Sequence, residues 1–375
     1  MADQVTKATR GRNDWVLIGT TLGLTIFGLL MVYSSSYVEG FLLEPENPTY
    51  YLTRQLIWFA LAIPILVFMM YFRYEHYQKM TPVLLGVSIV LLLLVVLIGT
   101  GRETTGADRW IRMGSLNMQP SEFVKVAMAI YLAHVYSRKQ AYIAHFKTGV
   151  LPPLVVVGVI FSLIMLQPDF GTGTLIMLTA IMLVFFSGAK WRHLFGLAAV
   201  GIVGFLVLAL LRPYRIARLT SFLDPFADAT NSGFQLINGY LAIANGGVTG
   251  MGIGQSLQKM RHLPEAHTDF ILAVISEELG FLGVLIVLIG YGIILFRGVA
   301  IGTKCKNPFG SLLAFAIVFQ MAAQVVFNVG AVTGLLPITG MTLPLISYGG
   351  TSLLVTFISI GILASIHRHN GRQVL

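Results

Sequence analysis

Asp269 is the residue of this sequence best suited to general-base chemistry. It lies in the run PEAHTDF (264–270), beside His267 and Glu265, where a long polar segment passes into an apolar one. The dipole of a following helix would favour the carboxylate anion, whereas a neighbouring low-dielectric region would raise its pKa. A carboxylate balanced in this way could accept a proton from a substrate hydroxyl. The structural alternative is that Asp269 is an N-cap or first-turn acid of that helix.

Basic residues of the same polar segment could bind a diphosphate, because Arg pairs bidentately with phosphate oxygens. They are Arg212, Arg215, Arg218, Lys259 and Arg261. Arg109 and Trp110 form a second candidate substrate contact in a shorter polar segment. Long basic side chains also reach toward lipid headgroups, and Trp is enriched at membrane interfaces, so all of these residues fit either a substrate clamp or a membrane anchor.

Two charged residues interrupt an apolar segment, where each isolated charge would cost at least about 2.5 to 3.5 kcal/mol. Glu122 and Lys125 are three residues apart and therefore share one helical face, on which they can pair with each other or face a cavity. Asp169, in the run QPDFG (167–171), either caps a short turn or makes a polar contact inside the bundle.

Glu277 and Glu278 form a second intramembrane acidic site. They follow Asp269 by about eight residues, which corresponds to about 12 Å of helix rise. In one continuous helix they are expected to lie too deep to share the role of Asp269.

The elements that must position these residues are membrane-spanning helices. Hydrophobic residues make up 56% of the 375 residues and charged residues only 11%, against about 25% charged in soluble domains. Crossing the hydrocarbon core takes about 20 apolar residues as a helix, whose backbone polar groups are paired internally. Ten segments meet or approach this length: 15–35, 57–72, 82–99, 120–136, 150–166, 172–187, 193–211, 270–296, 312–332 and 347–366. The fold class is therefore all-α, a polytopic membrane protein.

The distribution of Lys and Arg predicts the orientation of these spans. An even number of spans places both termini on one side, and that side carries most of the basic residues, so it is predicted to be cytoplasmic. Residues 1–13 then form a cytoplasmic tail, and 212–269 form a long extracytoplasmic loop between spans seven and eight. The chain is predicted to be a single integral membrane domain, 1–375. The net charge of +9 is scattered through short loops without aromatic platforms, which argues against nucleic-acid binding.

The long loop is itself a prediction of function. At nearly 60 residues it far exceeds the usual 2 to 8 residues between bundle helices. Apolar periodicity over 234–244 and closely spaced glycines over 246–254 predict short interfacial helices joined by glycine turns. The glycines favour packing over phosphate binding.

Taken in order, several runs make this chain resemble the SEDS family of shape, elongation, division and sporulation proteins. The runs are RWI (109–111), QPSEFVK (119–125), QPDFG (167–171), PEAHTDF (264–270), EELG (277–280), GLLP (334–337) and LPLISYGG (343–350). The likeness covers nearly the whole chain. The runs DPFAD (224–228) and GQSLQK (254–259) look more like the division branch than the elongation branch, and the sporulation branch stays open.

The resemblance implies an inverting peptidoglycan glycosyltransferase that polymerises lipid II, in the cell membrane and at the division septum. The family's essential acid falls on Asp269, its important Trp on Trp110, and its intramembrane acid and base on Glu122 and Lys125. The implied partners are a class B penicillin-binding protein, which cross-links the strands, and other membrane proteins of the division machinery. The cofactor is unknown, because no metal motif is present although a divalent cation could take part.

Two other function classes remain open from the sequence. A flippase for the lipid-linked precursor would use Glu122, Lys125, Glu277 and Glu278 as a polar path through the membrane. A non-catalytic scaffold for division proteins would tolerate substitution of Asp269. The long loop and the lack of internal repeats favour the polymerase over the flippase.

Overall fold

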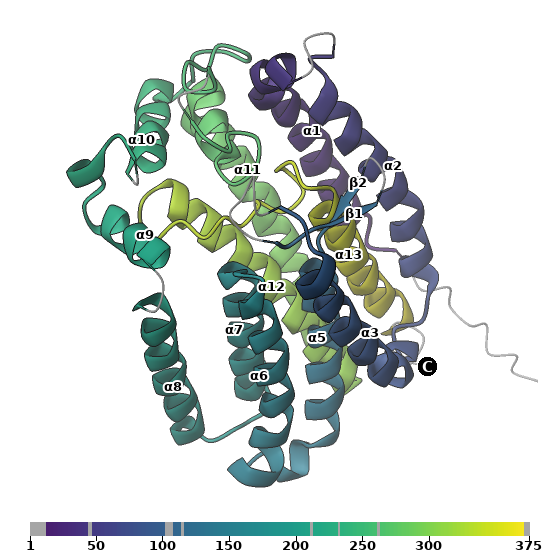
Figure 1. Ribbon diagram of the computed structural model, residues 1–375. Coiled ribbons are helices and arrows are strands. Elements are labelled where there is room, and N and C mark those ends of the chain that lie inside the picture. The colour runs from purple at the N-terminus through teal and green to yellow at the C-terminus, as the bar shows by residue number, and fades with distance from the viewer. Residues whose placement is uncertain are drawn as a thin grey trace, which may run out of the picture.

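The computed structural model describes residues 13–43, 47–101, 108–113, 116–210, 213–231, 233–260 and 263–370. Within these ranges ten long helices form one bundle (Figure 1). They are α1 (Trp15–Leu43), α2 (Tyr50–Tyr71), α3 (His76–Ile98), α5 (Pro120–Arg138), α6 (Leu151–Leu166), α7 (Phe170–Phe186), α8 (Trp191–Leu210), α11 (Ile271–Lys304), α12 (Pro308–Val332) and α13 (Gly350–Asn370). Each of the ten predicted apolar segments falls on one of these helices.

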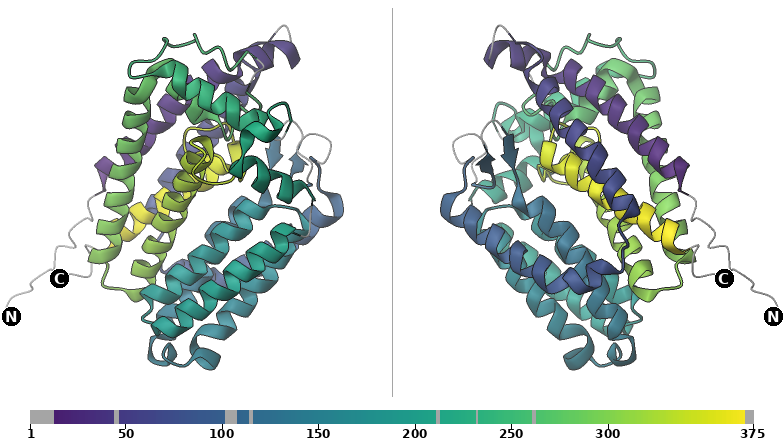
Figure 2. Two further views of the ribbon diagram at one scale, coloured as in Figure 1. Left: turned by 90° about the vertical axis from the view of Figure 1, so that its left-hand side faces the viewer. Right: turned by 90° about the vertical axis from the view of Figure 1, so that its right-hand side faces the viewer.

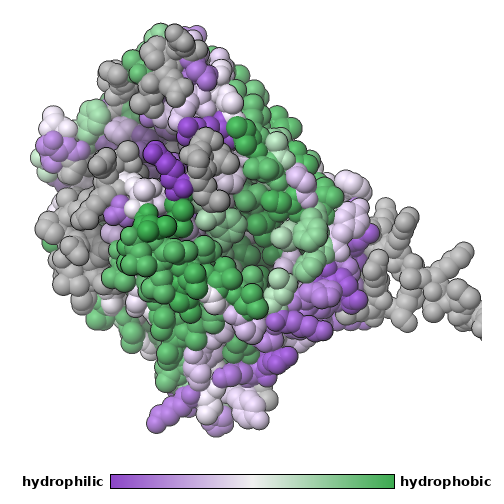
Figure 3. Space-filling view, turned by 45° about the vertical axis from the view of Figure 1, so that its right-hand side comes forward, coloured by the Kyte–Doolittle hydropathy of each residue, from purple (hydrophilic) through white to green (hydrophobic). Residues whose placement is uncertain are grey.

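Seven spans among the described residues are long and apolar enough to cross a membrane, and α7 is a shorter apolar helix. α5, which carries Glu122 and Lys125, and α8 complete the set of ten. Hydrophobic residues form a broad band across the visible face of the molecule in Figure 3, and many large apolar side chains are exposed, among them Leu97 and Phe68. Exposed apolar surface of this extent, on helices long enough to span a bilayer, marks a membrane-facing surface. The chain is an all-α polytopic membrane protein, as predicted.

The centre of the bundle is closely packed around α13. This helix lies against α2, α5, α11 and α12, and nearly all of its residues are buried. Small residues permit this approach: a Cβ added at Gly361 would lie 2.5 Å from the Cβ of Met69 on α2. Close backbone approach at small residues is how helices associate in lipid, where no hydrophobic force drives them together.

Short elements connect the long helices. An antiparallel hairpin of β1 (Ile111–Met113) and β2 (Leu116–Met118) precedes α5. The 3₁₀ turn η1 (Gln140–Tyr142) and the π-helical turn η2 (Phe146–Val150) lead from α5 to α6. The hairpin was not predicted, because strands this short carry no period-two signal.

The long loop contains short helices, as predicted. They are α9 (Pro213–Leu223), the 3₁₀ turn η3 (Pro225–Asp228) and α10 (Phe234–Gly246). The positive-φ glycine turns of the loop, however, follow α10 instead of joining one short helix to the next. These elements lie at one end of the bundle, hereafter the loop end, opposite the end where α1 begins and α13 finishes (Figure 2). At that opposite end Arg297 binds Asp14, and Arg368 donates to Asn13.

The helix α11 is broken at Gly280. This residue has φ 66° and ψ −164°, a conformation open only to glycine. The glycine segment of the long loop fills the break: Phe281 N donates to Gly247 O at 2.9 Å, and Met251 N donates to Glu277 O at 2.9 Å. The break therefore separates a short outer part, 271–279, from a long part that follows Gly280.

The packing role predicted for the loop glycines is confirmed at Gly246 and Gly250, whereas Gly252 and Gly254 adopt positive φ with no close neighbour at the Cβ position. A Cβ at Gly246 would lie 1.8 Å from Ser276 O, and one at Gly250 would lie 2.2 Å from Glu278 O. Only glycine lets the two backbones approach this closely.

Candidate active site

Asp269 lies immediately before α11, between the long loop and the bundle. The N-cap residue of α11 is Phe270, and no side chain caps this helix, so the N-cap alternative for Asp269 is wrong. The carboxylate is buried, with only 9% of the residue exposed, and Thr268 Oγ1 lies 3.4 Å from its Oδ1. Its backbone carbonyl is held by Asn328 Nδ2 at 2.7 Å. The backbone of Asp269 is thus held in place, while its carboxylate can still accept a proton.

The pKa of Asp269 is raised to about 7. Burial is the largest cause, and the negative charge of Glu265 raises the pKa further. The positive charge of Arg218 and hydrogen bonding act in the opposite direction. A carboxyl group with this pKa is divided between its two protonation states near neutral pH, which suits a general base.

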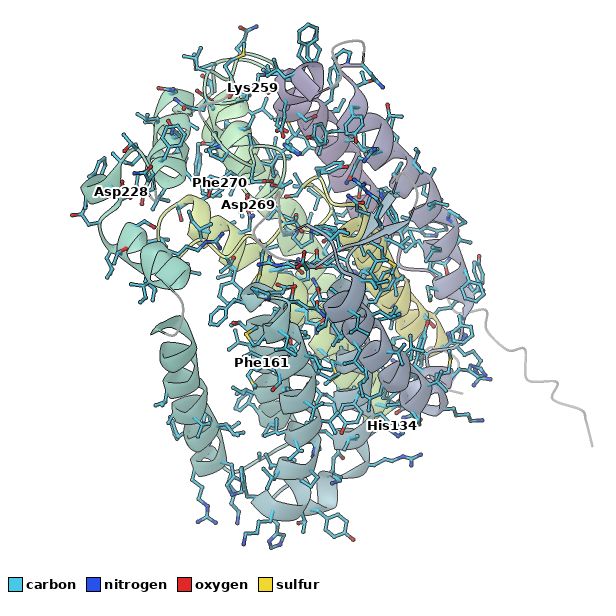
Figure 4. All side chains as sticks on the ribbon, viewed as in Figure 1. His134, Phe161, Asp228, Lys259, Asp269 and Phe270 are labelled. Atoms are coloured by element: carbon cyan, nitrogen blue, oxygen red, sulfur yellow. The ribbon has the colours of Figure 1, made fainter. Side chains whose placement is uncertain are left out.

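The segment that carries Asp269 is clamped by the loop between α12 and α13. Tyr348 N donates to His267 O at 2.9 Å, and Ser347 Oγ donates to Thr268 O at 2.5 Å. Asn328 also donates to Met341 O at 2.9 Å, which ties the same loop to α12. The site is therefore assembled from the end of the long loop, α12 and the segment before α13 (Figure 4).

His267, which the sequence placed beside the carboxylate, is enclosed by Glu39, Tyr51 and Tyr348. It is 4% exposed, and its ring centroid lies 4.3 Å from that of Tyr51 and 5.4 Å from that of Tyr348. Its Nδ1 lies 3.1 Å from Oε2 of Glu39, at ion-pair distance but without the alignment of a hydrogen bond. Sequence reasoning missed Glu39 and Tyr51, because neither lies near the PEAHTDF run along the chain.

Arg218 is the loop cation whose charge acts on the pKa of Asp269. It lies on α9, donates from Nη1 to Ile338 O at 2.9 Å, and lowers the pKa of Asp269 through its charge. The backbone of Arg215 lies on the same helix, whereas its side chain is outside the described part of the structure. Arg212 and Arg261 are outside it altogether.

Lys259 does not occupy the position expected of a substrate clamp or a lipid anchor. Its ammonium is buried and lies 2.7 Å from Glu278 Oε1, while donating to Ser34 Oγ on α1 at 3.1 Å. Ser34 Oγ in turn donates to Glu278 at 2.7 Å. Both expectations require an accessible cation, and here the loop folds its own lysine onto α11.

The expectation that Glu277 and Glu278 lie deeper than Asp269 is also wrong. Figure 4 shows Lys259, the partner of Glu278, nearer the loop end than Asp269 and Phe270. The short helical part after Asp269 therefore runs toward the loop end, and the chain turns back at Gly280. A single continuous helix was assumed, and the break reverses the order.

Glu277 is held by the long loop as well. Its carboxylate accepts from Asn245 Nδ2 at 3.0 Å, from Gln258 N at 3.2 Å and from Ser256 Oγ. It is fully buried. These donors give it a structural role in fastening the loop to α11.

Glu122 and Lys125 form the expected pair within the bundle. Lys125 Nζ lies 2.9 Å from Glu122 Oε1 and donates to Gln324 Oε1 at 3.2 Å. Both side chains also line a small cavity of about 30 Å³ together with Gln320 and Thr356. Pairing and facing a cavity are therefore both realised.

Arg109 and Trp110 lie beside the β1–β2 hairpin. The backbone of Trp110 pairs with Thr100, and Arg109 Nη2 donates to Pro168 O at 2.6 Å. Arg109 thereby bridges the hairpin region and the turn before α7.

Asp169 combines the two roles that the sequence left open. It is the N-cap residue of α7, where its Oδ1 accepts from Thr172 N at 3.2 Å. Its Oδ2 accepts from Gln119 Nε2 at 3.1 Å and from Ser121 Oγ at 2.9 Å, which are polar contacts to the start of α5. Among the described residues, no group of three or more His, Cys, Asp or Glu side chains could hold a metal ion.

Known proteins are similar to this chain in sequence over nearly its whole length. The family model described as cell cycle protein, FTSW_RODA_SPOVE, matches residues 14–372. Stage V sporulation protein E of Bacillus subtilis is 41% identical, over 95% of this chain and 97% of that protein. The probable peptidoglycan glycosyltransferase FtsW of the same organism is 43% identical, over 94% of this chain and 90% of that protein.

Solved structures share the fold. A chain from a study of the structural coordination of polymerization and crosslinking by a peptidoglycan synthase complex matches with a TM-score of 0.78 and 28% identity, over 96% of this chain and 98% of that one. The rod shape determining protein RodA of Thermus thermophilus matches with a TM-score of 0.70 and 28% identity, over 96% of this chain and 97% of that one. With a family model that covers the bundle and the long loop, this chain belongs to the FtsW, RodA and SpoVE family of cell cycle proteins.

Proposed function

We propose that this protein is an inverting peptidoglycan glycosyltransferase that polymerises lipid II into glycan strands. The observation that carries the proposal is the buried carboxylate of Asp269, whose pKa of about 7 suits a base at neutral pH. The relatives named as probable peptidoglycan glycosyltransferases support the same reaction.

Asp269 accepts the proton of the acceptor sugar 4-hydroxyl as its oxygen attacks the anomeric carbon of the donor. The bond from that carbon to the undecaprenyl diphosphate breaks, and the diphosphate leaves with the bonding electrons. No second carboxylate is needed, in contrast to glycoside hydrolysis, because the diphosphate is a good leaving group without a strong acid. Arg218, Arg109 and the loop cations Arg215 and Arg261 are proposed to stabilise its negative charge.

The remaining site residues have supporting roles in this proposal. Trp110 contacts the substrate beside Arg109, while Glu122, Lys125 and Asp169 maintain a polar interior that orders the bundle below Asp269. The cavity at Glu122 and Lys125, about 30 Å³, has room for one or a few water molecules but not for a sugar diphosphate. This size favours the polymerase over the flippase.

The cellular setting follows the same resemblance. The chain is proposed to be a single membrane domain with both termini in the cytoplasm and the loop end outside, acting at the division septum with a class B penicillin-binding protein and other division proteins. The runs DPFAD (224–228) and GQSLQK (254–259) support the division role. The match to a peptidoglycan synthase complex supports a cross-linking partner.

Polymerisation of purified lipid II, with and without the partner transpeptidase, tests this function. Asp269→Asn should reduce the rate at least a hundredfold, because general-base catalysis contributes about 10² to 10⁴. Asp228→Asn is the matched control, since Asp228 lies in the same loop on η3, where its Oδ1 accepts from Asn231 Nδ2 at 3.0 Å. More than a tenth of the wild-type rate in Asp269→Asn would exclude the base role, and lipid II flipping without polymerisation would favour the transporter.

A further inference from the structure

Glu39, near the end of α1, belongs to none of the runs that carry the family resemblance, yet it reaches the segment that bears Asp269. Its Oε2 lies 3.1 Å from His267 Nδ1, and its Oε1 accepts from Tyr51 Oη at 3.1 Å. The Tyr51 ring also contacts the His267 ring at a tilt of 50°, and the Tyr348 ring lies edge-on to Tyr51 at 5.1 Å between centroids. One carboxylate therefore connects α1, α2 and the segment before α11.

His267 is separated from Asp269 by a single residue, so a change in the His267 ring position is passed to Asp269 through two peptide units. The backbone of this segment is already bound by Tyr348 N and Ser347 Oγ, whereas the His267 side chain contacts the rings of Tyr51 and Tyr348 and the carboxylate of Glu39. These contacts are complementary: hydrogen bonds from the loop hold the backbone, and the Glu39 carboxylate lies against the imidazole.

We propose that Glu39 is a positioning residue for the glycosyl transfer, which acts through His267 to hold Asp269 in its reactive geometry. The inference rests on the proposed function for its kinetic consequence, although the contact itself does not. Misplacing a reacting group by about 1 Å can lower a rate by about a hundredfold. The groups that face His267 are Glu39 on α1, Tyr51 on α2 and Tyr348 before α13, and Glu39 is the charged member of this set.

The exposure of Glu39 separates positioning from a purely structural role. Its side chain is 49% exposed, so its replacement leaves no cavity in the core. Glu39→Gln keeps the shape and removes the charge, and Glu39→Asp keeps the charge on a shorter side chain. The control is Glu75→Gln, which weakens the contact of the partly exposed Glu75 with Arg73 beyond the opposite end of α2.

Steady-state polymerisation kinetics should show a lower kcat in Glu39→Gln, by about tenfold, with KM within about twofold of wild type. Glu39→Asp should recover part of the loss, and Glu75→Gln should match wild type. In a His267→Ala background, Glu39→Gln should have no further effect on kcat, because its action passes through the missing imidazole. Additive losses in this cycle, or a wild-type kcat in Glu39→Gln, would overturn the proposal.

Hydrogen–deuterium exchange provides a readout that does not depend on activity. In Glu39→Gln, peptides covering 264–270 should exchange faster than in wild type, whereas peptides of α12 should be unchanged. Unchanged exchange over 264–270 would refute the positioning role even if the protein proved not to polymerise lipid II. Failure of the proposed function would instead appear as an inactive wild type whose exchange still responds to Glu39→Gln.

Discussion

Removing one partner of the buried pair between Lys259 and Glu278 should destabilise the protein more than removing both. Both side chains are nearly inaccessible, at 5% and 0% exposure, and their charges lie 2.7 Å apart. In Lys259→Met, Glu278 retains only the hydroxyl of Ser34 among the donors described here, which cannot balance a full negative charge. The lone carboxylate must then be protonated or hydrated at the expense of folding.

The magnitude follows from the burial of this pair. Breaking a buried ion pair by deleting one member typically costs about 3 to 5 kcal/mol, whereas replacing both members by neutral side chains of similar volume is often neutral or stabilising. We therefore expect Lys259→Met to lose about 3 to 5 kcal/mol and Glu278→Gln to lose a comparable amount. The double variant should fall within about 1 kcal/mol of wild type, since no uncompensated charge remains.

Denaturation of the purified protein in one fixed detergent measures these differences in the free energy of unfolding. Polymerisation kinetics with lipid II on the folded variants then show whether Lys259 also contacts the substrate. A substrate clamp at Lys259 would instead raise the KM for lipid II, and Glu278→Gln would not restore it. Additive losses of stability in the double variant would refute the pairing. A KM raised equally in the single and double lysine variants would return Lys259 to the substrate site.

Two further predictions follow from the site and from the break in α11. Because Asp269 must be ionised to accept a proton, turnover should rise as pH increases through about 7. Glu265→Gln removes the second cause of the raised pKa of Asp269, so it should shift this rise to lower pH in a pH–rate profile. An unchanged pH–rate profile would contradict this account of the pKa of Asp269. The sign is opposite for stability, since a carboxyl with a raised pKa in the folded state costs stability as pH increases from about 4 to about 7. Gly280→Ala should lower the free energy of unfolding by more than about 1 kcal/mol in chemical denaturation, because the new Cβ would lie 2.4 Å from Gly250 N and φ is 66°. Gly292→Ala is the control and should be neutral, because a Cβ there meets no neighbouring atom within 4 Å. Equal stability of the two variants would argue against the break in α11.

Much of the architecture could be predicted from composition and local patterns. Lipid imposes a length of about 20 apolar residues on each span, so the ten helices appear directly in the sequence. The pairing of Glu122 with Lys125 could also be predicted, because a separation of three residues on one helix fixes their relation before any tertiary contact forms. The short helix 234–246 of the long loop follows from its apolar periodicity in the same way, whereas which loop glycines pack against α11 does not.

The contacts of the candidate site required the tertiary structure. The path of the long loop over α11 decides which of the loop cations is buried against Glu278 and which can face a substrate. No local sequence pattern encodes that path. The order of Asp269 and Glu278 along the bundle depends on the backbone of one residue, Gly280, whose positive φ reverses the chain. Glu39 reaches His267 because α1 and α2 pack beside the end of the long loop. Residue type and spacing thus determined which groups are present in this membrane protein and that Asp269 is its candidate base, while packing between distant segments decided which charges meet, because side chains remote in the chain become neighbours only when the bundle closes.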